Sequence, residues 1–170
     1  MRKRLPRLPD DVLPRLDVPV QRLSDADRQA LLDYLRALSL SDRAAFFGHP
    51  LSDARVAAYA QRIDFSADAH FAARGAASLI IGVAHCRVIG GHGVVNVHVA
   101  HGYRRRGIGT ALGAALTGFG RRRDLGRLRA YFDKADPIAA HLARALGMAL
   151  KVGIDRFYAE LPLVPDDAPA

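Results

Sequence analysis

The stretch Y-R-R-R-G-I-G-T at residues 103–110 combines residue types that indicate a specific binding chemistry. Three arginines supply positive charge, and Gly107 and Gly109 lack the Cβ atoms that would hold a ligand away from the backbone. An apolar pattern with helical period follows at once, so the glycines fall where a helix begins. The first four N–H groups of a helix have no intrahelical partner and lie at the positive end of its dipole. The stretch therefore predicts a seat for an anionic group such as pyrophosphate.

Other interpretations of this stretch are open when it is taken alone. It does not match the Rossmann fingerprint, because the third spaced glycine is missing and no glycine precedes Gly107 in the loop. It does not match a P-loop, because the Lys-Ser/Thr pair is absent. A solvated basic turn and a nucleic-acid patch both remain, although only Tyr103 offers the aromatic stacking that single-strand binders use.

A second candidate for chemistry lies just upstream, where residues 94–100 alternate in polarity. Val95, Val97 and Val99 share one face of the predicted strand, which leaves Asn96 and His98 on the other. An imidazole titrates near neutral pH and is suited to base catalysis, whereas the amide is suited to positioning a water or a substrate. The alternative for His98 is a structural hydrogen bond within the sheet or beneath a covering helix.

The elements that must position these residues follow from periodicity and caps. Ser24, Ser41 and Ser52 precede helical patterns, and Asp136-Pro137 begins a helix that Gly147 closes. The glycines at 90, 91 and 93 indicate a turn between two strands. The expected order is β-α-α-β-β-β-α-β-α-β-β, which predicts an α/β fold with a mixed sheet and helices on both faces. The predicted strands are residues 18–23, 70–74, 78–89, 94–100, 127–132, 148–152 and 156–161.

Composition limits the class of protein. The 170 residues allow one domain, which we expect at residues 17–162, between a flexible basic arm at 1–16 and a polar tail at 163–170. A net charge of +8 favours anionic partners without choosing among them. No apolar run approaches the ~20 residues of a membrane span. One cysteine, Cys86, excludes an internal disulfide and a cysteine zinc site, so we expect a cytoplasmic protein without a metal.

Three segments together resemble a known family. Residues 95–112 closely resemble the signature of the GNAT N-acetyltransferase superfamily, with Arg104, Gly107 and Gly109 on its three defining positions. Residues 136–148 resemble that family's second cofactor-side segment, and the element order over about residues 18–161 is similar to its fold. Residues 38–64 further resemble a bacterial subgroup related to protein lysine acetyltransferases.

The resemblance implies acetyl-CoA as co-substrate and a set of residues that bind it. The pyrophosphate would lie on the N–H groups of residues 104–109, and the pantetheine arm would pair with the backbone of residues 97–99. A backbone N–H near Val99 would bind the thioester carbonyl. Asp136 is expected chiefly as a helix cap that also borders the pantetheine. The implied cofactor-binding residues are Val97, Val99, Arg104, Arg105, Arg106, Gly107, Ile108, Gly109, Thr110 and Asp136.

The resemblance also implies that Asn96 and His98 border the cleft where acetyl group and acceptor meet, and these two are the predicted catalytic residues. Two features of the family pattern are absent. Residues 93–95 are Gly-Val-Val where many relatives carry a glutamate, and Ala143 stands where many carry a tyrosine that acts as general acid. His141 would point about 200° around the helix from that position, so it is a poor substitute.

Three functional hypotheses follow. The first is an N-acetyltransferase that transfers acetyl directly from acetyl-CoA to a primary amine, with polyamines, amino sugars, amino acids and protein lysines all open as acceptors. The second is a CoA-binding sensor without turnover, which the two absent residues motivate. The third, a nucleic-acid-binding protein, has only the net charge in its favour. The sequence leaves a homodimer open.

Overall fold

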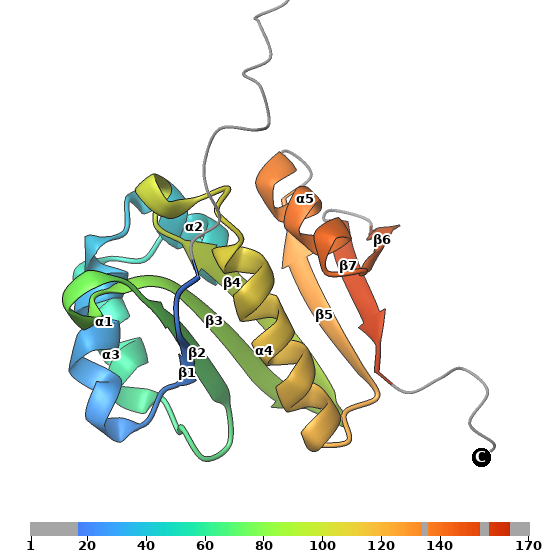
Figure 1. The fold of residues 1–170 in the computed structure, drawn as a ribbon, viewed down its shortest axis with the longest axis horizontal. Helices are drawn as coiled ribbons and strands as arrows, with labels where there is room; N and C mark the ends of the chain where they lie inside the picture. Colours follow the sequence, from blue (N-terminus) through green and yellow to red (C-terminus); the bar gives the residue numbers. More distant parts are fainter. Residues whose placement is uncertain (1–16, 134–135, 154–156, 164–170) are drawn as a thin grey trace, which may run out of the picture.

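The computed structural model describes residues 17–133, 136–153 and 157–163; the expected arm, and the tail apart from residue 163, lie outside them. Within these ranges, seven strands form one sheet in the order β1-β2-β3-β4-β5-β7-β6 (Figure 1). Only β4 and β5 are parallel, as expected for a mixed sheet. The strands are β1 Val20–Arg22, β2 Ala69–Arg74, β3 Ile80–Ile89, β4 His92–Val99, β5 Arg127–Phe132, β6 Ala149–Val152 and β7 Phe157–Pro162.

Between β1 and β2 the described chain holds three α-helices, as the patterns after Ser24, Ser41 and Ser52 predicted, although the expected order of elements counted only two. The middle helix is independent because it is capped at both ends. The Ser39 hydroxyl, and not that of Ser41, accepts from the Asp42 N–H at 3.0 Å, and Gly48 ends the helix at φ = 81°. The helices are α1 Arg28–Ala37, α2 Leu40–Phe47, α3 Asp53–Arg62, α4 Ile108–Arg122 and α5 Pro137–Ala145.

Two apolar clusters hold helices against opposite faces of the sheet. Leu112 and Leu116 of α4, both almost fully buried, pack in one cluster with Ile81 of β3. Leu35 of α1 and Val56 of α3 pack in the other with strand residues that point the opposite way. Figure 1 accordingly shows α4 on one side of the sheet and α1, α2 and α3 on the other. This confirms the predicted arrangement of helices on both faces.

The sheet is divided where β4 meets β5. These parallel strands pair only at Gly93 with Leu128 and at Val94 with Arg129, and beyond that point they diverge (Figure 1). Gly93 lies inside β4 and not in the preceding turn, which corrects its expected place. A Cβ there would lie 2.6 Å from the Cys86 Sγ and 2.7 Å from a Leu128 methyl. Close approach therefore explains this glycine, while Gly90 and Gly91, both at positive φ, make the turn.

The strands beyond the divergence share one buried carboxylate. Glu160 is 6% exposed; Arg129 Nε donates to it at 2.6 Å and Lys151 Nζ at 3.1 Å. The hydrogen bond from Arg129, together with Lys151, lowers the pKa of Glu160 from its ordinary 4.5 to about 2. A carboxylate with a depressed folded-state pKa stabilises the fold above its unfolded-state pKa, and this stabilisation is lost as pH falls toward the folded value.

We therefore expect Glu160→Gln to lower the melting temperature at pH 7, with the deficit shrinking as pH falls from about 4.5 to 2. Thermal unfolding followed by circular dichroism across this range measures it. Asp33→Asn is the matched control, because Asp33 is exposed and bonds to Gln29 within its own helix. A deficit that is the same at every pH would contradict the assignment.

Candidate active site

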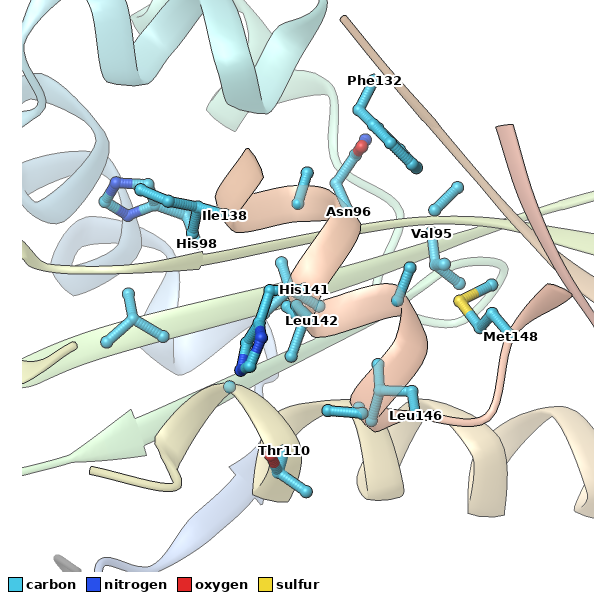
Figure 2. A pocket seen from close by; sticks show the side chains of 18 of the residues that line it. Val95, Asn96, His98, Thr110, Phe132, Ile138, His141, Leu142, Leu146 and Met148 are labelled. Atoms are coloured by element: carbon cyan, nitrogen blue, oxygen red, sulfur yellow. The ribbon is translucent and has the colours of Figure 1, made fainter. Parts of the chain in front are cut away.

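A cavity of about 370 Å³ opens where β4 and β5 diverge, and α2, α4 and α5 contribute to its other walls. That volume lies within the usual range for small-molecule sites. Figure 2 shows Val95, Leu146 and Met148 at one end, where they belong to the same apolar cluster. Asn96 and His98 line it from β4. The cavity is thus an apolar slot with a polar edge along one strand.

The beginning of α4 lies at the wall of this cavity and is open to a ligand. Its N-cap is Gly107, which has φ = 84° and therefore a conformation that other residues adopt at a cost. No described side chain caps the first turn. Gly109 also lines the cavity, and a Cβ built on it would lie 3.2 Å from a Leu142 methyl of α5. The unpaired N–H groups and the helix dipole consequently remain available to an anion.

Most of the predicted cofactor residues come together in this cavity. Ile108 does not line it, because its side chain is 1% exposed and packs in the core, and Arg106 is not among the lining residues. Asp136 lines the cavity and caps α5, accepting from the N–H groups of Ile138 and Ala139 at 3.0 and 2.9 Å. The residues of the predicted set that line the cavity are Val97, Val99, Arg104, Arg105, Gly107, Gly109, Thr110 and Asp136.

Arg104 directs its guanidinium group toward the protein and not toward solvent. Its Nε donates to the Val99 carbonyl at 2.8 Å, and its Nη2 donates to Asp42 of α2 at 2.7 Å. Although burial alone would raise the pKa of Asp42, the bonds from Arg104 and Ser39 hold it below its usual value. Arg104 therefore ties the loop before α4 to both β4 and α2. The negative charge of Asp42 is thereby neutralised by the Arg104 guanidinium group.

His98 is 7% exposed and both of its ring nitrogens are engaged. Nδ1 lies 2.7 Å from the Tyr34 hydroxyl, and Nε2 lies 3.2 Å from Nη2 of Arg104. Because arginine can only donate, Nε2 accepts and Nδ1 carries the proton that is donated to Tyr34. Burial lowers the pKa of His98 although Asp42, 3.4 Å from Nε2, opposes this. The imidazole is therefore neutral at neutral pH.

The cavity also contains lining residues that the sequence analysis did not assign. Tyr131 of β5 lines the cavity and is 43% exposed. Strand alternation places its side chain on the face of β5 that lies away from Leu128 and Phe132, whose side chains pack in the apolar cluster. That alternation was visible in the sequence and could have identified it. His141 lies in the wall as well, and Figure 2 shows it directed from α5 toward Thr110 at the beginning of α4.

The comparison with family models decides the family. The model described as the acetyltransferase (GNAT) family matches residues 30–148, well over half of the sequence. The chain belongs to the GNAT acetyltransferase family. The match includes β4, the loop, α4 and α5, so it covers every lining residue of the cavity in this GNAT domain except Leu161. It also confirms the resemblance carried by residues 95–112 and the predicted class of enzyme, an acyl-CoA N-acyltransferase.

Solved structures share the GNAT fold at low sequence identity. The GNAT domain of S. lividans PAT has a TM-score of 0.72 at 19% identity, covering 84% of this chain and 89% of its own. A phosphinothricin acetyltransferase from Sinorhizobium meliloti, in complex with AcCoA, has a TM-score of 0.72 at 19% identity, with coverages of 91% and 93%. Spermidine N-acetyltransferase from Vibrio cholerae, in complex with CoA and spermine, has a TM-score of 0.69 at 14% identity, with coverages of 86% and 95%. No curated protein matches this GNAT chain.

The described part of this GNAT chain lacks two kinds of feature. No helix there combines the length and apolar character needed to cross a bilayer. Nor do three or more histidine, cysteine or acidic side chains gather there in a way that could hold a metal ion.

Proposed function

We propose that the protein transfers an acetyl group from acetyl-CoA directly to a primary amine. The observation that carries this proposal is the opening between β4 and β5, with the uncapped beginning of α4 beside it. An enzyme of this class needs a site for the cofactor pyrophosphate and a channel that leads the pantetheine arm to the point of acetyl transfer. The cavity offers both. The family membership supports the same chemistry.

The described residues fit the cofactor at both ends. The N–H groups of the first turn of α4 would hold the pyrophosphate, with Arg105 exposed at the rim. The backbone of Val97 to Val99 faces the opening, because β5 pairs with β4 only as far as Val94. An extended pantetheine arm would pair there as an added strand. Acetyl-CoA supplies an activated thioester carbonyl, and an N–H near Val99 would stabilise the negative charge that develops on its oxygen.

The acceptor amine must lose a proton, because a lysine-type amine has a pKa of about 10.4. His98 would accept this proton at Nε2 once the amine, or a water that relays its proton, displaces the Arg104 N–H from the Nε2 lone pair; Arg104 would keep its bonds to Asp42 and to the Val99 carbonyl. The Asp42 carboxylate, 3.4 Å away, would stabilise the imidazolium that forms. Asn96 lines the same edge of the cavity and would position the acceptor or a relaying water. Tyr131 lines the same cavity from β5 and would contact the acceptor from that side.

A screen of acceptors with purified protein and acetyl-CoA tests this function by release of the CoA thiol. The panel should include polyamines, amino sugars, amino acids including phosphinothricin, and lysine peptides. Spermidine and phosphinothricin are included because the V. cholerae and S. meliloti relatives are named for them. Thiol release above the rate without acceptor, with a product heavier by one acetyl group, is the expected result.

The sensor hypothesis retains one specific observation in its favour: Ala143, at the usual tyrosine position, is buried and lines the cavity without a polar group. Stoichiometric CoA binding with no thiol release for any acceptor would favour a sensor. Absence of CoA binding would contradict both hypotheses and favour the third, a nucleic-acid-binding protein.

A further inference from the structure

A second cavity, of about 470 Å³, lies between α3 and strands β2 and β3. It shares no lining residue with the cavity beside β4. Arg55 and Arg62 line it from α3, and Arg87 lines it from β3. Arg55 and Arg62 are seven residues apart, which places them on one face of the helix about 10 Å apart along its axis. Three guanidinium groups therefore border one concavity from two sides.

The positive charge of this cavity is largely uncompensated within the described chain. All three arginine residues are exposed, and none forms an ion pair with another described residue. Asp68 is the one carboxylate among the lining residues. It accepts from the Val88 N–H at 3.3 Å and lies 3.6 Å from Nε2 of His85. Three cationic side chains thus line one cavity with a single carboxylate, and a bound anion would offset this excess of positive charge.

Two stacked histidines and a tyrosine form the deeper part of the cavity wall. The rings of His70 and His85 stack at 4.1 Å, and the Tyr59 hydroxyl lies 3.1 Å from Nε2 of His70 and 3.5 Å from Nδ1 of His85. Burial lowers the pKa of both imidazoles, that of His70 to about 3. Both are thus neutral at neutral pH and do not repel each other. They lie close enough to sense a charge that enters the cavity.

We propose that this cavity binds a small phosphate-bearing anion, either free phosphate or a phosphate monoester. Guanidinium groups match phosphate oxygens with paired, charge-assisted hydrogen bonds, and several can share one phosphate. The long side chains of Arg55 and Arg62 can close from the helix while Arg87 contacts the ligand from the strand. A concave site of this size favours a compact anion over a polymer, since polymer binding relies on an extended basic surface with stacking aromatics.

Nuclear magnetic resonance of the seven histidine side chains in the full-length protein tests the proposal, with inorganic phosphate as the probe. We expect saturable shifts of the His70 and His85 imidazole resonances, with the other histidines largely unaffected apart from any beside α4. Arg62→Ala should weaken this binding at least about tenfold. Arg121→Ala is the matched control, because Arg121 is an exposed arginine that lines neither cavity, and it should leave the binding unchanged.

Phosphate also has a candidate seat at the beginning of α4, so the two sites must be separated. Shifts of His70 and His85 that persist in Gly109→Val and disappear in the double variant Arg55→Ala/Arg62→Ala support the second site. Glycerol 3-phosphate in place of phosphate shows whether a monoester is accepted, and acetate at equal concentration controls for charge alone. The proposal is overturned if phosphate leaves both imidazoles unshifted, if Arg62→Ala binds as wild type does, or if an oligonucleotide displaces phosphate at lower concentration than the monoester does.

Discussion

Gly109→Val is expected to weaken CoA binding at least about 100-fold, which corresponds to about 2.7 kcal/mol. A side chain at this position would occupy the cavity wall where the first N–H groups of α4 are exposed. Its Cβ alone would approach a Leu142 methyl to 3.2 Å and a Val99 methyl to 3.8 Å, so the larger valine side chain would crowd this wall and narrow the space proposed for the cofactor. Isothermal titration calorimetry with CoA measures the loss directly and does not depend on knowing the acceptor.

Gly102→Val provides the control for this measurement. Gly102 lies in the same connection between β4 and α4, but a Cβ added there meets nothing within 4 Å. It should bind CoA within about threefold of wild type, because no ligand-facing N–H is covered. Equal affinities for the two variants, both with wild-type melting temperatures, would show that the beginning of α4 is not the anion seat.

His98→Gln is expected to lower kcat about 100-fold, the usual order for loss of a general base, with little change in the KM for acetyl-CoA. Glutamine is chosen because its amide can still accept from Arg104 and donate to Tyr34, which are the partners of His98. The loop that Arg104 holds should therefore keep its position. The measurement is steady-state kinetics with the best acceptor from the screen.

The pH profile distinguishes a base from a structural histidine. A general base must be unprotonated, so wild-type activity should fall as pH drops through the pKa of His98, which burial holds below 6.5. This acid limb should be absent from His98→Gln. His49→Gln is the control, since His49 is exposed and lines neither cavity. A variant whose profile keeps the wild-type acid limb would remove His98 from the proton transfer.

Local signals in the sequence predicted most elements because they determine local structure. Alternation identified β5 at residues 127–132 without error, and Asp136 with Pro137 correctly marked the beginning of α5. Gly93 was assigned to a turn because glycine has two uses that look alike in sequence. Positive φ explains Gly90 and Gly91, whereas Gly93 avoids a contact with Leu128, which is distant in the sequence. Such a contact exists only once the sheet has formed.

The same distinction applies to the site. The beginning of α4, which we propose as the anion seat, was predictable because the loop and the helix that follows it are adjacent in the sequence. The bond from Arg104 to Asp42 joins residues 62 positions apart, and that from Tyr34 to His98 joins residues 64 apart. Neither spacing carries a local signal. As a result the sequence predicted which imidazole faces the cleft but not that three side chains from α1, α2 and the loop before α4 surround it.

The short contact between β4 and β5 gives the cleft a pivot at its closed end. Gly93 and Val94 form that pivot, and Val99 lies five residues farther on, about 17 Å along the strand. If the two strands rotated relative to each other about this contact, the mouth near Val99 would open or close by more than the strands move at residue 93. Replacing Gly93 with alanine would push against Leu128 and thereby change the width of the slot from a point that no substrate touches.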